Sequence, residues 1–177
     1  MLKRLRVLLR AKDGMAAVEF AFLAPIMVLL FFGTLELSAA LDCRSRVSIV
    51  ASTAADIVAQ ETTVSTTDMN NVFAALNTII YPYSSAPAKI VISSIVDNGA
   101  GVDKVAWSNA QNATARTVGS IVTVPTGLIT PNSGGGVILA EITYSFAPTT
   151  TVYLGNALSM TSSFYAHPRR SLTVIHS

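Results

Sequence analysis

Residues 12–22, KDGMAAVEFAF, place one carboxylate inside an otherwise apolar run. Between residues 15 and 35, Glu19 is the only charged residue, and Gly14 comes directly before the run. A charged residue at the centre of a membrane span costs about 2.5–3.5 kcal/mol, so such residues usually have a partner. If a protease cuts after Gly14, a new ammonium forms on Met15 and Glu19 becomes the fifth residue. In an assembly of staggered helices, that ammonium could pair with Glu19 of a neighbouring chain. The alternative is a carboxylate that lies near the membrane surface or is protonated.

The sequence holds little that supports catalysis. Its two histidines, His167 and His176, lie in the last eleven residues without a cluster of further ligands at metal-binding spacing. No nucleophile elbow, phosphate-binding loop or paired-carboxylate motif occurs. We therefore expect no enzyme activity, no metal and no cofactor. Trp107 is expected to pack on a sheet, and the single cysteine, Cys43, to serve as a small helix residue.

Charge is concentrated at the N-terminus. Only 12% of the 177 residues are charged, against about 25% in soluble domains. The cations of the first segment are Lys3, Arg4, Arg6, Arg10 and Lys12. They outnumber Arg44 and Arg46, which follow the apolar run, so the positive-inside rule predicts a cytoplasmic N-terminus and a periplasmic or external body. The other basic residues are scattered, which argues against a nucleic-acid partner.

Hydropathy divides the chain into three parts: a basic cytoplasmic leader at 1–14, a transmembrane helix at 15–41, and a periplasmic or extracellular domain at 42–177. Residues 15–35 alone would make a helix of about 31 Å, enough to cross a hydrocarbon core. Beyond this point, apolar residues recur at three- and four-residue spacing without Gly or Pro, so the helix is expected to continue to about residue 60. Pro25 should kink the helix because it removes a backbone donor.

The remaining residues predict one more helix and a sheet. Ser65 and Asp68 resemble a capping box before an amphipathic helix at about 67–81. Strands are predicted within a sheet region at about 88–170: residues 89–96, 102–108, 136–146 and 158–167, with 119–125 as a weaker candidate. The predicted fold class is α+β, a long N-terminal helix packed on a small antiparallel β-sheet.

The N-terminal motif resembles a known processing site. A basic leader, Gly14, four apolar residues, Glu19 and an apolar helix are similar to the start of type IV pilins and pseudopilins. An aromatic after the glutamate, here Phe20, fits the tight-adherence (Tad) branch. GMAAVEFAFLAPIMVLLFFGTLEL looks like the signature of TadE-like proteins, and the resemblance covers residues 12–40. The positions that carry it are Gly14, Ala16, Val18, Glu19, Phe20 and Pro25. Met15 departs from the phenylalanine usual at the first mature position of type IVa pilins.

This resemblance implies a function. A membrane prepilin peptidase would cleave after Gly14 on the cytoplasmic face. Because about 115 residues follow the long helix, the chain looks like a minor pseudopilin of a Tad/Flp (type IVc-like) pilus assembly or secretion machine, one that primes, caps or regulates the fibre in cell adhesion. Its implied partners are the peptidase, other pilins and minor pseudopilins, the inner-membrane assembly platform and the lipid bilayer. The implied location is the bacterial inner membrane, single-pass, or the pilus on the cell surface.

Two other interpretations stay open at this point. One is an uncleaved single-span scaffold or surface-binding protein. The other is a secreted protein released by signal peptidase near residues 38–40. The apolar run exceeds the 7–15 residues typical of a signal peptide, which disfavours the second alternative. Sequencing the N-terminus of the membrane-extracted protein separates all three.

Overall fold

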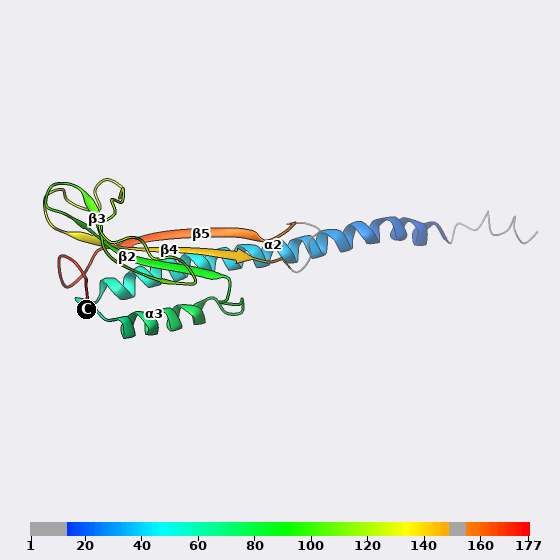
Figure 1. Ribbon diagram of the computed structural model, residues 1–177. Helices are drawn as coiled ribbons and strands as arrows, with labels where there is room; N and C mark the ends of the chain where they lie inside the picture. Colours follow the sequence, from blue (N-terminus) through cyan, green and yellow to red (C-terminus); the bar gives the residue numbers. More distant parts are fainter. Residues whose placement is uncertain (1–13, 149–154) are drawn as a thin grey trace, which may run out of the picture.

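The longest element of the molecule is one N-terminal helix, on which the sheet packs. A computed structural model describes residues 14–148 and 155–177. Helix α2 (Met15–Ala59) is continuous over 45 residues, and its second half packs on an antiparallel sheet (Figure 1). The predicted α+β arrangement is confirmed. The helix ends at Ala59, one residue before the predicted limit.

Four strands form the main sheet, in the order β3-β2-β4-β5, with every neighbouring pair antiparallel. The strands are β2 (Ala88–Asp97), β3 (Asp103–Gln111), β4 (Gly136–Phe146) and β5 (Leu158–Ala166). A parallel pair, β1 (Thr63–Val64) and β6 (Ile175–His176), joins the chain's C-terminal segment to the end of α2. No sequence pattern predicted this pair, because two-residue strands are too short to show an alternating pattern.

The weaker strand candidate at 119–125 is wrong. These residues form one isolated bridge, between Lys104 and Ile121, and run along the edge of β3 as an irregular segment. Gly119, at a φ of 80°, turns the backbone at its start, and Pro125 has no amide hydrogen to donate to a ladder. The segment therefore covers an edge without extending the sheet.

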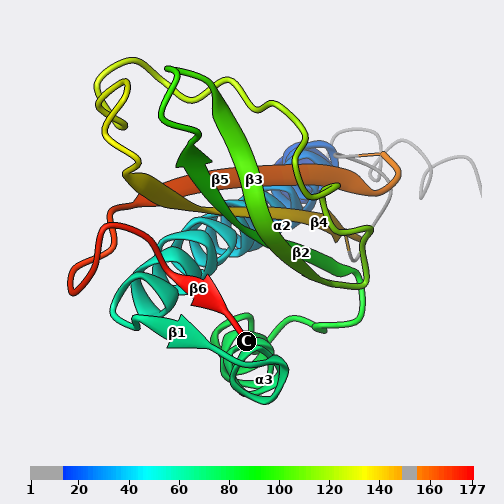
Figure 2. The ribbon, with the colours of Figure 1, turned by 60° about the vertical axis from the view of Figure 1, so that its left-hand side comes forward.

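Helix α3 (Thr66–Ile79) begins at the predicted capping box. The Ser65 hydroxyl accepts from the Asp68 amide at 3.2 Å, and the Asp68 carboxylate accepts from the Ser65 amide at 2.9 Å. Figure 2 shows α3 near β1 and β6, beside the C-terminal half of α2. Its apolar side chains Met69, Phe73 and Leu76 are buried, so α3 closes one side of the core.

The core lies between α2 and the sheet. The helix contributes mostly small and β-branched residues, and the strands contribute isoleucines. The members from α2 are Val47, Val50, Ala51, Ala54, Ala55 and Val58, each at most 1% exposed. Facing them are Ile90 and Ile92 of β2 and Ile138 and Ile142 of β4, all fully buried. Alanine at the contact lets the helix backbone approach the sheet closely, because an alanine side chain ends at Cβ.

Enlarging this contact should destabilise the fold. Ala54→Leu inserts three heavy atoms where the native side chain is fully buried. We expect the free energy of unfolding to fall by about 1–3 kcal/mol, because the extra volume forces the helix and sheet apart. Thermal unfolding of the full-length protein in detergent, followed by circular dichroism, would show a lower midpoint. Ala75→Leu, on the exposed face of α3, is the matched control, and an equal effect of both variants would contradict the proposed contact.

Candidate processing and assembly segment

The first half of α2 stands free of the domain. From Met15 to Leu35 nearly every side chain is exposed, and Glu36 is the first buried side chain of the helix. Large apolar residues such as Phe22 and Phe31 are 74% and 59% exposed. The free stretch of 21 residues is about 31 Å long, close to the roughly 30 Å of a bilayer's hydrocarbon core. Within the described residues, α2 is the one helix long and apolar enough to cross a membrane.

Gly14 occupies the position directly before this helix. It is exposed, and its φ of −89° and ψ of −9° suit any residue. A Cβ built on Gly14 would meet no described atom within 4 Å. Neither packing nor backbone conformation therefore requires a glycine at this position.

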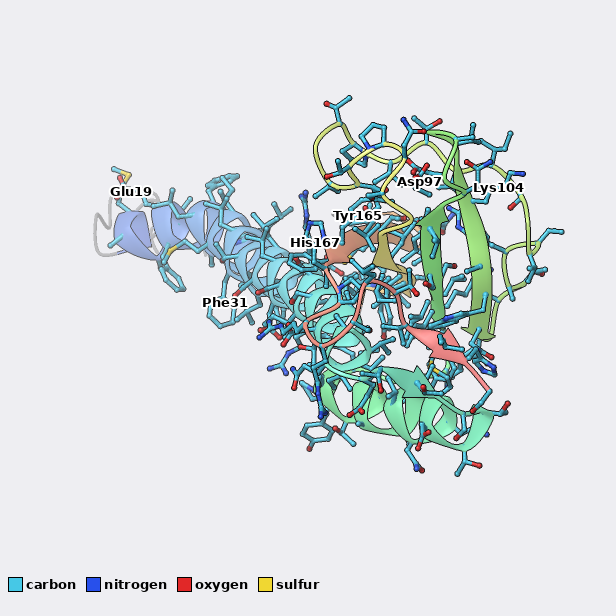
Figure 3. All side chains as sticks on the ribbon, turned by 90° about the vertical axis from the view of Figure 1, so that its left-hand side faces the viewer. Glu19, Phe31, Asp97, Lys104, Tyr165 and His167 are labelled. Carbon is cyan, nitrogen blue, oxygen red and sulfur yellow. The ribbon has the colours of Figure 1, made fainter. Side chains whose placement is uncertain are left out.

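The other predicted site residues share the free end of the helix. Figure 3 places Glu19 far from the sheet, with Phe31 between it and the domain. Met15 and Phe20 are 60% and 66% exposed, and none of the described residues forms an ion pair with Glu19. The helix continues unbroken through Pro25, so the kink there stays a prediction. The leader cations Lys3, Arg4, Arg6, Arg10 and Lys12 lie outside the described residues.

A polar cluster marks the junction between the free helix and the domain. The Arg46 guanidinium donates to the Asp42 carboxylate at 2.9 Å, and to the Ile79 and Tyr81 carbonyls at 3.3 and 2.5 Å. The Tyr83 hydroxyl donates to the Ala39 carbonyl at 2.8 Å and lies 3.1 Å from the Asp42 carboxylate. Arg46 thus binds carbonyls at the C-terminal end of α3, where cations are favoured. These contacts hold α3 against α2 just beyond the apolar stretch.

Sequence reasoning missed this cluster. Asp42 and Arg46 have the i, i+4 spacing of a helical ion pair, which could have indicated their contact. Nothing local indicated Tyr83, more than 40 residues away. The hydrogen bond from Arg46 lowers the pKa of Asp42, while burial, followed by the adjacent Asp42 carboxylate, raises the pKa of Tyr83 to about 12.

Trp107 and His176 pack against each other, whereas His167 lies on the surface. Trp107 is 7% exposed and donates from its indole nitrogen to the Val174 carbonyl at 2.7 Å. His176 lies against Trp107 with ring centroids 5.6 Å apart and is half-buried. His167 is exposed. Among the described residues, no group of three or more His, Cys, Asp or Glu side chains could hold a metal ion.

The first half of α2 is long and apolar enough to span a membrane, and the helix continues unbroken into the core of an antiparallel-sheet domain. Residues 14–56 match the model of a family described as TadE-like protein. The match covers nearly all of α2 and none of the main sheet. No curated protein and no solved structure matches the chain significantly.

The junction also determines the reactivity of the single cysteine. Cys43 is fully buried, and its burial, followed by the adjacent Asp42 carboxylate, raises its pKa to about 11. At pH 8 the thiolate, which is the reactive form, is therefore about 100-fold rarer than for a thiol with a pKa of 9.

We expect Cys43 to resist iodoacetamide at pH 8 in the folded protein. In a Ser45→Cys variant the new, exposed thiol should be labelled at least about 100-fold faster than Cys43, as followed by mass spectrometry. In denaturant both thiols should react at similar rates. Equal labelling of the two thiols in the folded protein would contradict the buried position of Cys43.

Proposed function

We propose that the chain is a minor pseudopilin of a Tad-type pilus assembly or secretion machine. Prepilin peptidase cleaves it after Gly14, and the mature chain keeps the first half of α2 as its membrane span. The orientation follows the charge of the leader, with the N-terminus in the cytoplasm and the sheet domain in the periplasm. In this role the subunit primes, caps or regulates the fibre together with other pilins and the inner-membrane assembly platform.

The observation that carries the proposal is the unexplained glycine. Gly14 has ordinary backbone angles and no described atom within 4 Å of a Cβ built on it, so the described part of the fold gives no reason for a glycine there. A peptidase supplies such a reason, because a small residue must fit beside the scissile bond. An exposed position at the very start of the helix also leaves the bond accessible. The TadE-like match, which begins at residue 14, supports the same assignment.

Glu19 gives the second support. Its side chain lies on the exposed part of a helix that a bilayer surrounds, about 6 Å along the axis from Met15. A carboxylate there is costly without a cation. Cleavage creates an ammonium on Met15, and a neighbouring helix staggered by about one turn brings its ammonium level with Glu19. The pair then forms only in the assembly, which links maturation to incorporation.

Cleavage can be tested directly. Co-expression with an active prepilin peptidase should shorten the chain by the 14 residues that end at Gly14, and N-terminal sequencing should begin at Met15. Gly14→Ile should block the cut, because the larger side chain cannot fit beside the scissile bond, whereas Gly14→Ala should be partly tolerated.

An inactive peptidase serves as the negative control, and a known substrate of the same peptidase confirms its activity. An intact N-terminus under these conditions would support the uncleaved single-span scaffold in place of the pseudopilin. A new N-terminus near residues 38–40 would instead show release by signal peptidase.

Glu19 should be needed for assembly and dispensable for cleavage. Glu19→Ala is expected to leave processing and membrane insertion intact, because the peptidase reads Gly14 and the leader. Incorporation into the pilus or its initiation complex should fall about tenfold or more, the effect of losing about 1.4 kcal/mol of pairing energy. Glu19→Asp should give an intermediate value, since it keeps the charge but loses reach. Quantitative immunoblotting of sheared pili and of membranes measures both steps.

The control is Glu61→Ala, which removes an exposed carboxylate beyond the other end of α2. Normal incorporation of the Glu19→Ala variant at wild-type expression would mean that Glu19 is a surface carboxylate without a partner in the fibre. Gly14 would then be the remaining functional signal.

A further inference from the structure

Two carboxylates lie opposite each other where the hairpin between β2 and β3 begins and ends. Asp97 is the last residue of β2, Asp103 is the first residue of β3, and the two are partners in the antiparallel register. Residues directly opposite in such a pair lie on the same face of the sheet, with Cβ atoms about 4.5–5.5 Å apart. Two ionised carboxylates at this separation repel each other, which weakens the hairpin.

Asp97 is almost completely buried. It is 2% exposed, and its Oδ2 accepts from the Gly99 and Gly134 amides, each at 3.2 Å. These two hydrogen bonds join the hairpin to the loop that leads into β4, and Figure 3 shows Asp97 beside that loop. The other carboxylate oxygen, Oδ1, is also buried and has no hydrogen-bond partner among the described residues. A buried carboxylate oxygen without a partner is costly, so a group that carries positive charge would stabilise the fold at this point.

No described side chain neutralises this pair. Neither Asp97 nor Asp103 forms an ion pair with a residue of the described ranges. Burial, followed by the charge of Asp97, raises the pKa of Asp103. The direction of this shift agrees with the geometry, because both causes disfavour a second ionised carboxylate beside the first. A cation bound between the two carboxylates would remove the repulsion and give the Asp97 Oδ1 a partner.

The groups near the pair determine which cation fits. Carboxylate, amide and carbonyl oxygens are hard ligands, which calcium and magnesium prefer. The Asn132 side-chain oxygen lies 3.7 Å from a Cβ built on Gly101, so the loop brings an amide oxygen to the same hairpin. Asp103 is half-buried, which leaves the pair open to solvent on one side. Magnesium demands a near-ideal octahedron, whereas calcium accepts about six to eight oxygens in a flexible arrangement, so ligands on a hairpin and a separate loop favour calcium.

We propose that Asp97 and Asp103 bind one Ca²⁺ ion between the β2–β3 hairpin and the loop that leads into β4. Asp97 contributes its free Oδ1 and Asp103 its carboxylate, while water, backbone carbonyls or the Asn132 amide complete the coordination. The ion cancels the repulsion within the pair and fastens the hairpin to the loop. This inference goes beyond the pseudopilin function and does not depend on it. It departs from the sequence-based expectation of no metal, because two carboxylates six residues apart form no recognisable metal motif.

Calcium titration of the purified full-length protein in detergent tests the proposal. Isothermal titration calorimetry should give one site per chain with a Kd of about 10⁻⁴–10⁻³ M, the range of extracellular calcium modules. Asp103→Asn should weaken binding about tenfold or more, because it removes one of the two charged ligands. Glu61→Gln, which removes an exposed carboxylate beyond the end of α2, is the matched control and should bind calcium as the wild type does.

Thermal unfolding distinguishes a calcium site from two carboxylates that only repel each other. In a calcium chelator, Asp103→Asn should unfold at a higher temperature than the wild type, because the substitution removes the like charge opposite Asp97. Calcium at about 10 mM, roughly 10–100 times the expected Kd, should raise the midpoint of the wild type by about 3–10 °C. The midpoint of the Asp103→Asn variant should not change with calcium.

Several results would overturn the proposal. One is the absence of calcium binding by the wild type up to about 10 mM, well above the range of extracellular modules. Another is equal binding by the wild type and the Asp103→Asn variant, which would place the ion elsewhere. Equal or tighter binding of Mg²⁺ would refute the assignment to calcium. Because the titration uses the full-length chain, an uncleaved N-terminus in the presence of active peptidase would refute the pseudopilin function and leave the calcium result unaffected.

Discussion

One helix has two different surfaces, and the rest of the structure depends on this constraint. The first half of α2 exposes large apolar side chains, which a bilayer would cover in the proposed membrane-spanning arrangement, while the second half buries a stripe of alanine and valine against the sheet. Backbone hydrogen bonds within α2 satisfy its polar groups in both surroundings. The change of surface occurs between Leu35 and Ala40, where buried residues first recur. No Gly or Pro occurs between residues 34 and 61 to interrupt the helix across that change.

The two helices and the strongest strand are well predicted from the sequence because their signals are local. The helical spacing of apolar residues up to Val58 locates the end of α2 within one residue. The alternation from 136 to 146 gives β4 with its observed bounds, and Ser65 with Asp68 gives the capping box of α3. The motif around Gly14 and Glu19 is also local, so the resemblance to TadE-like proteins could be stated from the sequence.

Other features depend on residues far apart in the chain and could not be predicted. Arg46 binds the end of α3, and Arg116 binds Glu141, through contacts that no single segment encodes. The segment 119–125 has β-branched residues typical of a strand, yet Gly119 and Pro125 restrict it to a cover over β3.

The unbroken helix has a mechanical consequence for the domain. If the first half of α2 spans the membrane as proposed, the part from Glu36 to Ala59 extends about 35 Å beyond the hydrocarbon core, and α2 contains no break between the two parts. Membrane helices tilt by about 20° on average, and such a tilt would carry the far end of the domain sideways by about 12 Å. In that arrangement the domain would move as a rigid arm that pivots in the membrane. Neighbours that fix the angle of the span would then also fix the position of the sheet domain beyond the membrane.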